Sequence, residues 1–562
     1  MDPKIWHRHY DKGVPAAIDY NDWPISSLLD RTAERLPDRV ALIFLNCKLT
    51  YRQLKDQVDR LATALTALGV VKDSRVAIHL PNLPQTVISH YAVLACGAQV
   101  VMTNPLYVPR EIEHQWNDSE VDVAITADFL YHRSIAPIKD KVGVRHYLVT
   151  SIPEYLRFPL RQLAPFKLKK QDPPAIAAMP TGPNIHPFRK LIDGTSPAPP
   201  RPQVAMDDLC ALQYTGGTTG VSKAAMLSHR NLSYNAQQVR AWMPRMVDGD
   251  EVFLAALPYF HIFGMTVCMN VPVMMGGSIV IMPNPRDIPQ MLKNISKHHI
   301  TMMPGVPAIF GAILNSPGIE KLDLTSVKAV FSGSAPLPED VTRRFEKITG
   351  ATIFEGFGLT ETSPATHVNP VDGNRKTGFV GMPMPDTDAR VVDMETGTSE
   401  LPPGEEGELI IKGPQVMVGY WKRQDETDLM IKDGWLFTGD LAVMDDEGYF
   451  KIVGRKKDMI LASGYNIFPD EIDQVLTNHP AIIEACTIGV PDEKRGETVK
   501  SFVVKGEGAE ATADELMAHC RENLAVYKVP RSIEFRDELP KSAMMKLLRR
   551  SLRDEEVAKS KR

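Results

Sequence analysis

Residues 50–78 read TYRQLKDQVDRLATALTALGVVKDSRVAI, and this stretch decides the fold class. Apolar side chains recur along one face of a predicted helix: Leu54, Val58, Leu61, Leu65 and Leu68. Thr50 can cap the start of that helix, and Gly69 can end it. The run RVAI at residues 75–78 follows at once as a short strand. The same alternation of strands and helices continues through the first two-thirds of the chain, so we expect an α/β fold with parallel sheets covered by helices.

A second, smaller domain is expected near the C-terminus. The chain has 562 residues, too many for one hydrophobic core. After about Gly454 its character changes to charged clusters followed by compact strands and helices. Thr512 and Glu515 form a capping box before a helix that carries Leu516, Cys520 and Leu524. We interpret this part as an α+β domain of about a hundred residues.

Composition narrows the class of protein. Hydrophobic residues make up 43% and charged residues 24%, as in ordinary soluble globular proteins. The formal net charge of −5 gives no reason to expect a nucleic-acid partner. The six cysteines are scattered without a CxxC pair, which indicates buried thiols in a reducing compartment. The polar N-terminus is not typical of a secretory signal, so we expect a cytoplasmic protein.

One long stretch, residues 252–285, contains no charged side chain and could be mistaken for a membrane span. Pro258, Gly264, Pro272 and the Gly276–Gly277 pair interrupt it. Such punctuation favours a buried strand–helix–strand passage of an α/β protein.

Residues 153–202 hold twelve of the 44 prolines, so little regular structure is expected there. Within them, residues 155–170 read YLRFPLRQLAPFKLKK and interleave apolar with basic side chains. One interpretation is a patch that touches an anionic membrane surface, at the inner face of the membrane. The other is a solvated connector whose apolar residues pack on the protein body. Pro159 and Pro165 argue against a single long amphipathic helix.

The sharpest local signal is residues 214–223, YTGGTTGVSK. Its glycines, which let the backbone approach a ligand, are Gly216, Gly217 and Gly220. Its hydroxyl and ammonium donors are Thr215, Thr218, Thr219, Ser222 and Lys223. This density of donors suits a polyphosphate, although the spacing is not that of a Walker A loop.

The segment YTGGTTGVSK resembles the signature loop of the adenylate-forming superfamily, which includes acyl-CoA synthetases, luciferases and peptide-synthetase adenylation domains. Six further segments between Leu257 and Lys546 follow in the family's order. The resemblance implies a large N-terminal domain (residues 1–455) of parallel sheets with a small distorted β-barrel. It also implies a smaller, mobile α+β domain (residues 456–562).

Within the large domain the resemblance assigns roles residue by residue. His261, in LPYFHIFG, matches the substrate gate, whereas a hydrogen-bonded core histidine is the plainer alternative. Residues around adenine are implied from two segments: Gly333, Ser334, Ala335, Glu355, Gly356, Phe357 and Gly358. Phe357 stands where relatives usually have Tyr, and its ring would stack on the base. Thr360 would bond the α-phosphate, and Glu361 would hold Mg²⁺.

The remaining assignments lie nearer the C-terminus. Asp440 would accept hydrogen bonds from the ribose hydroxyls, with Arg455 as a second ribose or phosphate contact. For residues 455–457 the plainer alternative is a solvated basic turn. Lys457 would be the hinge between the domains, and Gly464 would line the coenzyme A channel. Lys546, in PKSAMMK, would reach the reacting carboxylate and the α-phosphate.

Two residues depart from the family pattern. Ala224 and Met545 stand where relatives normally have Gly, and both changes restrict the backbone. We therefore expect an effect on the rate of adenylation.

The resemblance implies an ATP-dependent ligase. A carboxylate attacks the α-phosphate of ATP with Mg²⁺ present, and the acyl-AMP passes its acyl group to the thiol of coenzyme A. No protein nucleophile is needed, and neither GxSxG nor a Cys/His signature occurs. The chain most resembles bacterial long-chain fatty acyl-CoA synthetases, some relatives of which form homodimers. Aryl- or short-chain acid ligases, carrier-loading ligases, a non-catalytic binding relative and a luciferase-like oxygenase remain alternatives.

Overall fold

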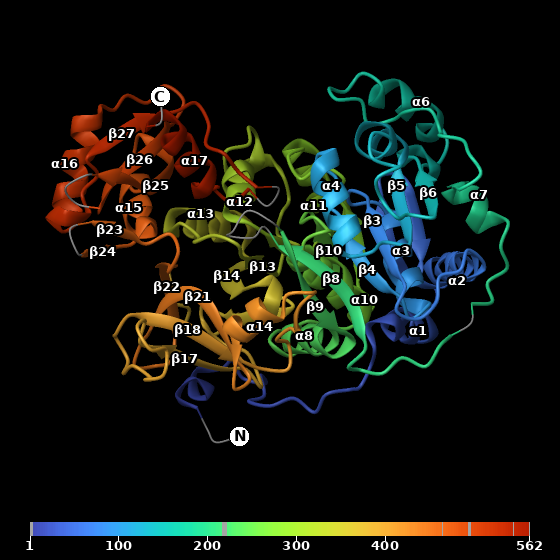
Figure 1. Cartoon of the computed structure of the whole chain (residues 1–562), viewed down its shortest axis with the longest axis horizontal. Coiled ribbons are helices and arrows are strands. Elements are labelled where there is room, and N and C mark those ends of the chain that lie inside the picture. Colours follow the sequence, from blue (N-terminus) through green and yellow to red (C-terminus); the bar gives the residue numbers. More distant parts are fainter. Residues whose placement is uncertain are drawn as a thin grey trace. The chain divides into compact units, whose positions relative to one another are not determined.

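The structure is a computed structural model that describes residues 4–199, 201–215, 222–462, 465–492, 496–542 and 545–560 (Figure 1). The chain forms two compact units. Unit 1 runs to Asp388 and includes Lys412–Asp433; unit 2 combines Ala389–Ile411 with the chain from Gly434 onward. The predicted boundary between residues 455 and 456 stays a prediction.

Two large sheets build unit 1. The first has the strand order β16-β15-β14-β13-β12-β10-β11-β1-β2, with parallel pairing from β14 through to β1. Its strands are β1 Val40–Phe44, β2 Cys47–Thr50, β10 Val252–Ala255, β11 Ser278–Ile281, β12 Met302–Gly305, β13 Ala329–Ser332, β14 Thr352–Gly358, β15 Ala365–Val368 and β16 Met382–Pro383.

The second sheet has the order β19-β9-β8-β4-β3-β5-β6-β7, again parallel in its middle. Its strands are β3 Arg75–His79, β4 Gln99–Met102, β5 Val123–Ala127, β6 His146–Thr150, β7 Ile185–Pro187, β8 Leu209–Thr215, β9 Lys223–Ser228 and β19 Gly419–Tyr420. The predicted α/β class with parallel sheets is confirmed.

Helices fill the connections between these strands, as right-handed crossovers require. The longer ones are α1 Ile25–Arg35, α2 Tyr51–Ala67, α3 Pro84–Ala95, α4 Pro109–Asp118, α8 His229–Ala241, α11 Ile288–His298, α12 Pro307–Leu314 and α13 Glu339–Thr349. Helix α2 begins as predicted, because the Thr50 hydroxyl accepts a hydrogen bond from the Gln53 N–H at 3.3 Å. Gly69 follows the helix in the left-handed region, with φ of +88°.

The charge-free stretch folds as predicted. It runs from β10 through α9 Ile262–Met265, the π-helical turn Thr266–Asn270 and α10 Val271–Met275 into β11. Across the residues that the structure describes, no helix is long and apolar enough to cross a membrane.

The expectation of little regular structure in the proline-rich stretch is wrong in part. It contains α6 Leu160–Leu168, β7 and α7 Phe188–Asp193. Pro165 lies inside α6, but a proline removes only one internal hydrogen bond, so a helix of two turns persists. None of the α6 residues is buried, and Figure 1 draws this helix at the margin of unit 1, beyond β5 and β6.

Unit 2 contains two smaller sheets. In the first, β18 Gly407–Lys412 pairs with β21 Trp435–Met444, which pairs with β22 Phe450–Arg455; β17 Asp388–Val392 lies beside β18. The second consists of β23 Ile460–Ala462, β24 Tyr465–Ile467, β25 Ile482–Asp492, β26 Gly496–Lys505 and β27 Ser532–Phe535. Its helices are α15 Pro469–Thr477, α16 Ala513–Asn523 and α17 Arg549–Ser560.

The expected α+β character of the C-terminal part is confirmed. Thr512 and Glu515 form the predicted capping box of α16, and Leu516 and Cys520 are fully buried against the second sheet.

Candidate active site

The predicted phosphate loop connects β8 to β9. These strands pair antiparallel, and Thr215 at the end of β8 lies opposite Lys223 at the start of β9. Five predicted loop contacts lie outside the described residues: Gly216, Gly217, Thr218, Thr219 and Gly220. The structure therefore fixes where the loop begins and ends, and its lysine occupies a defined position.

Lys223 has two partners within unit 1. Its Nζ lies 2.6 Å from a carboxylate oxygen of Glu426, on α14 Gln424–Met430, and 3.9 Å from the centre of the Tyr420 ring. An ammonium over an aromatic face is attracted by the ring quadrupole, most strongly where water is excluded. Tyr420 is 2% exposed, so this contact is sheltered from solvent.

Glu361, the predicted metal ligand, lies on the 3₁₀ turn Thr360–Thr362 that follows β14. The Tyr420 hydroxyl donates a hydrogen bond to Glu361 Oε1 at 2.6 Å. The backbone C=O of Glu361 also accepts the Met417 N–H at 2.8 Å. The structure thus brings Lys223 and Glu361 to one tyrosine, Lys223 at the face of its ring and Glu361 at its hydroxyl. Thr360 precedes Glu361 on the same turn.

Glu355 anchors the loop that the sequence places beside adenine. It lies next to Ser332 in the parallel pairing of β13 and β14, and its carboxylate accepts the Leu337 N–H at 2.8 Å. Burial raises the pKa of Glu355 to about 7. This bond fixes the far end of the loop carrying Gly333, Ser334 and Ala335, where Ser334 has a left-handed φ of +73°.

The glycines on either side of Phe357 are required by close packing. A Cβ on Gly356 would lie 2.2 Å from the Phe331 ring, and one on Gly358 would lie 2.0 Å from the Pro364 carbonyl oxygen. Phe357 itself is half-buried and makes an edge contact with His367 at 6.0 Å between ring centres. Part of the Phe357 ring thus remains accessible for stacking, as predicted for the adenine contact.

His261 caps α9. Its Nδ1 accepts the Phe263 N–H at 3.2 Å, and the residue is half-buried. This bond agrees with the plainer alternative of a structural histidine, but the side chain keeps some solvent access. The gate role stays a prediction.

Asp440 and Arg455 form the centre of the site in unit 2. They face each other in the β21–β22 pairing, with Arg455 Nε 2.9 Å from Asp440 Oδ1. Asp440 is 2% exposed, and its buried Oδ2 has no hydrogen-bond partner among the described residues. An unpartnered buried carboxylate oxygen is costly, so it fits the predicted acceptor for a ribose hydroxyl.

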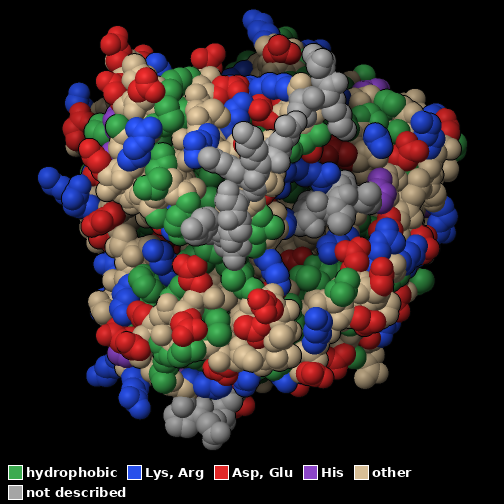
Figure 2. Space-filling model, turned by 60° about the vertical axis from the view of Figure 1, so that its left-hand side comes forward, with side chains coloured by type: hydrophobic (Ala, Val, Ile, Leu, Met, Phe, Trp, Pro, Cys, Tyr) green, Lys and Arg blue, Asp and Glu red, His purple; other side chains and the backbone are tan. Residues whose placement is uncertain are grey.

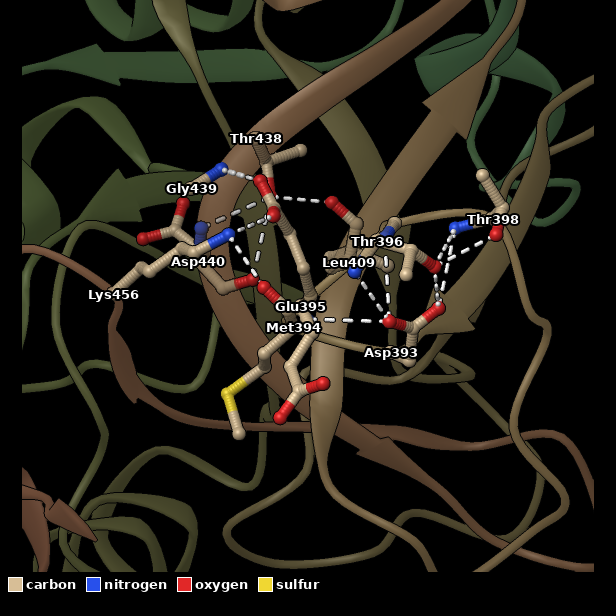
Figure 3. A network of polar contacts seen from close by, with 12 residues as sticks. Asp393, Met394, Glu395, Thr396, Thr398, Leu409, Thr438, Gly439, Asp440 and Lys456 are labelled. Carbon is tan, nitrogen blue, oxygen red and sulfur yellow. Dashed lines mark hydrogen bonds and ion pairs between the residues drawn. The ribbon is translucent and has the colours of Figure 1, made fainter. Parts of the chain in front are cut away.

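A polar network fixes the backbone around Asp440 (Figure 3). The Asp440 N–H donates to Thr438 Oγ1 at 3.1 Å, and the Gly439 N–H donates to Glu408 Oε1 at 3.1 Å. Lys456 Nζ donates to Glu408 Oε2 at 3.0 Å and to the Met394 carbonyl at 3.2 Å. Arg455 and Lys456 therefore both have carboxylate partners, and the Lys456 side chain is 45% exposed, so the solvated basic turn stays an alternative for Lys456.

Figure 3 also shows Asp393 holding the turn before β18. Its carboxylate accepts the backbone N–H groups of Thr396 at 2.6 Å and Thr398 at 3.2 Å. These bonds hold the pKa of Asp393 well below its usual range. The turn thereby presents the Met394 carbonyl to Lys456.

Lys546 lies in the same unit as this pair. The Ser542 N–H donates to the Lys546 carbonyl at 2.8 Å, and the Lys546 N–H donates to Ser542 Oγ at 3.2 Å, which closes a tight turn. The positive charge of Arg455, followed by desolvation, lowers the pKa of Lys546 to about 8. Asp440 and Asp470 oppose this shift but do not cancel it.

The two departures from the family pattern differ in the structure. Met545 adopts a left-handed φ of +59°, a region that favours glycine. Ala224 is a fully buried residue of β9 that pairs with Tyr214, and its backbone is an ordinary strand. The expected backbone restriction therefore matters at Met545, whereas at Ala224 the strand geometry suits any small residue.

Sequence reasoning missed Tyr420, Glu426 and Glu408. They lie in GYWKRQDET and GELIIK, which carry no pattern pointing to chemistry, and only the fold reveals their partners. Lys457 is described but its hinge role is untested, and Gly464 lies outside the described residues. Basic and acidic side chains are interspersed over the face that Figure 2 shows, so local pairs dominate the electrostatics there.

Comparison with known proteins matches the AMP-binding enzyme family to residues 29–421 and the AMP-binding enzyme C-terminal domain to residues 471–546. A long-chain-fatty-acid–CoA ligase of Bacillus subtilis (strain 168) is 43% identical over 561 residues, covering 99% of this chain and 98% of that protein. ATP-bound MatB from Rhodopseudomonas palustris superimposes with a TM-score of 0.83 at 31% identity, covering 94% of this chain and 98% of that one.

A third similar protein is the O-succinylbenzoate coenzyme A synthetase (MenE) of Bacillus subtilis, solved in complex with ATP and magnesium ion. It has a TM-score of 0.77 at 26% identity and covers 94% of this chain and 99% of that one. The family match spans well over half of the sequence. The predicted contacts from Thr215 to Glu361 fall within its first region and Lys546 at the end of the second, whereas Asp440 and Arg455 lie between the two. The chain belongs to the AMP-binding enzyme family.

Proposed function

We propose that this protein is an ATP-dependent long-chain fatty acid–CoA ligase, which converts a fatty acid to acyl-AMP and then to acyl-CoA with release of AMP and pyrophosphate. The observation that carries the fatty-acid assignment is the 43% identity, over nearly the whole of both chains, to a relative named for this activity. The geometry supports the binding of a nucleotide. Asp440 has a buried oxygen without a hydrogen-bond partner among the described residues, and the cationic side chains of Arg455 and Lys546 lie near it.

The chemical obstacle is electrostatic, since a carboxylate anion must attack the polyanion ATP. In unit 1, Lys223 supplies a fixed positive charge at the start of β9. In unit 2, Lys546 and Arg455 supply two more. Preorganised donors and charges of this kind stabilise charge that develops in the transition state.

Magnesium fits the residues on the unit 1 side. Among the described residues no group of three or more His, Cys, Asp or Glu side chains could hold a metal alone. Mg²⁺ commonly takes one or two carboxylates, with phosphates and water completing its shell. Glu361 is half-buried and held through Oε1, so it suits this role. When bound, the ion would neutralise phosphate charge.

The residue roles in this proposal are those that the family resemblance implies. Thr360 contacts the α-phosphate, and Thr215 opens the loop that cradles the polyphosphate. Asp440 accepts from the ribose, and rotation about Lys457 exchanges Lys546 for coenzyme A after the adenylate has formed. His261 gates the acyl group.

The test is a panel of carboxylic acids with AMP release as the readout, with and without coenzyme A. Long-chain acids should give the highest kcat/KM, and AMP turnover should require coenzyme A. A preference for aryl or short acids would replace the substrate class but keep the chemistry. Absence of acid-dependent exchange of labelled pyrophosphate into ATP would overturn the ligase assignment altogether.

The exposed helix α6 supports a peripheral association with membranes. Its side chains Leu163 and Phe166 are 56% and 71% exposed, and Phe158, just before the helix, is 76% exposed. Residues 155–171 contain five basic and no acidic side chains. An anionic bilayer complements both properties and is where long-chain acids reside.

Vesicle cosedimentation tests this association. Phe158→Ser with Phe166→Ser should weaken binding to vesicles containing anionic lipid while leaving activity on dispersed substrate intact. Unchanged cosedimentation would favour the connector interpretation. All six cysteines are buried and unpaired, in keeping with a cytoplasmic site at the inner membrane face; a homodimer stays a prediction.

A further inference from the structure

Tyr420 contacts both the phosphate-loop lysine and the predicted metal ligand. Its hydroxyl lies 2.6 Å from Glu361 Oε1, and its ring centre lies 3.9 Å from Lys223 Nζ. These are two different interactions, made by the edge and by the face of one ring. Lys223 and Glu361, two of the predicted cofactor contacts of unit 1, are thus both held by a residue to which we assign no contact with the nucleotide or the acid.

The backbone of Tyr420 is itself fixed. In strand β19 it pairs with Ala225 of β9, two residues after Lys223. Its N–H donates to Thr427 Oγ1 at 2.8 Å, and the Thr427 hydroxyl donates to the Arg423 carbonyl at 2.9 Å. The ring is therefore positioned by the same strand that carries the lysine, and it is nearly fully buried.

The hydroxyl is suited to remain a donor. The phenolic O–H is the only donor that the Tyr420 side chain carries, and it donates to Glu361 Oε1 at 2.6 Å. A neutral O–H that donates to Oε1 orients the Glu361 carboxylate. The remaining lone pairs of the carboxylate stay available to a hard cation.

We propose that Tyr420 is a positioning residue that orients Glu361 for a divalent cation and holds Lys223 for the ATP phosphates. The proposal rests on the proposed function, since it assigns Glu361 to the metal. The plainer alternative is a buried tyrosine whose hydroxyl only needs a partner. The two interpretations predict different results. Substitution of a merely structural tyrosine would lower the stability of the protein but leave its affinity for the cation unchanged.

Two substitutions separate the contacts. Tyr420→Phe keeps the ring beneath Lys223 and removes only the hydrogen bond to Glu361. Tyr420→Leu removes both. The matched control is Tyr234→Phe: Tyr234 is also buried, and its hydroxyl donates to a carboxylate, Asp22, at 2.5 Å.

The measurement is Mn²⁺ binding in the presence of ATP, followed by electron paramagnetic resonance, with no acid added. Loss of a hydrogen bond to a metal ligand typically weakens metal affinity 10- to 100-fold, so Tyr420→Phe should raise the Mn²⁺ Kd by about tenfold or more. Tyr420→Leu should additionally weaken ATP binding at saturating Mn²⁺, by about threefold or more. Tyr234→Phe should leave both constants unchanged.

The outcomes test the metal site at Glu361 separately from the positioning role of Tyr420. If the wild-type protein binds no Mn²⁺ with ATP, the assignment of the metal site fails. If the wild type binds but Tyr420→Phe has the same Mn²⁺ Kd and only a lower thermal midpoint, Tyr420 is structural and the inference is overturned. Should Tyr420→Phe prove unstable, its Mn²⁺ Kd is measured at a low temperature at which it stays folded, against the wild type and Tyr234→Phe at the same temperature, and an unchanged Kd there overturns the inference.

Discussion

Two charged clusters carry the predicted site residues, one in each unit, and they are organised differently. In unit 1 each charge has a partner: Lys223 is paired with Glu426, and Glu361 accepts from Tyr420. In unit 2, Arg455 is paired with Asp440 but lies near enough to Lys546 to lower its pKa. The buried Asp440 Oδ2 has no hydrogen-bond partner among the described residues.

This difference indicates that the two clusters respond differently to a bound ligand. A paired cluster holds its geometry whether or not a ligand is present, as preorganised catalytic groups should. In the unit 2 cluster, two neighbouring cations repel each other and a buried carboxylate oxygen has no partner among the described residues, so a ligand that satisfies them would stabilise the cluster. The predictions below test this contrast.

The largest effect is expected at Lys546. Lys546→Ala removes one of two close positive charges from the unit 2 cluster, and loss of such a stabilising group typically lowers a rate ~10²–10³-fold. The loss should fall on adenylate formation, measured as pyrophosphate exchange. Thioester formation from preformed acyl-AMP should remain close to wild type, and an equal loss in both half-reactions would contradict the role.

In unit 1, Glu361→Ala should be more damaging than Ser222→Ala, because only Glu361 is assigned to the cation. We expect a loss of about tenfold to a hundredfold in apparent Mg²⁺ affinity for Glu361→Ala and little change for Ser222→Ala. Mg²⁺ titrations of ATP binding provide the measurement. Matching titration curves for the two variants would show that Glu361 is not a ligand of the metal.

The pH profile tests the repulsion in unit 2. Lys546 carries its charge below its pKa of about 8, so the kcat/KM of adenylation should fall as pH rises through 8. Arg455→Gln removes the main cause of the lowered pKa, and the alkaline limb should therefore move to higher pH, even though overall activity drops. Lys456→Gln is the control, because that charge is paired with Glu408 and should leave the limb in place. A limb that stays near pH 8 in Arg455→Gln would show that another group titrates.

The two clusters also differ in how far sequence could predict them. The α/β class, the capped helix after Thr50 and the strand–helix–strand passage at residues 252–285 follow from periodicity, which is a local property. The roles of Glu361, Asp440 and Lys546 followed from resemblance. Tyr420 could not be predicted, because its partners lie 59 residues and almost 200 residues earlier and only strand pairing brings them together.

The proline-rich stretch shows the converse error. Counting prolines predicted little structure, yet α6 and α7 form, since a proline only removes one donor and a short helix needs few. The left-handed backbone of Met545 could not be predicted from the sequence either. Ala224 and Met545 both replace a usual glycine, but Ala224 lies in an ordinary strand and Met545 in a turn with a left-handed φ, so only Met545 is strained.

The smallest effect sharpens that last contrast. A non-glycine residue in the left-handed region costs about 1–2 kcal/mol, so Met545→Gly should relieve strain in the turn that carries Lys546. If that strain opposes the placement of Lys546, the rate of single-turnover adenylation should rise, by about fivefold at most for 1 kcal/mol.

Ala224→Gly is the matched control. In a buried strand the added chain entropy should lower stability by roughly 0.5–1 kcal/mol without any gain in rate. The contrary result is that Met545→Gly behaves like Ala224→Gly, with a lower thermal midpoint and no faster adenylation. That result would mean that packing of the Met545 side chain stabilises the fold by more than its left-handed backbone destabilises it.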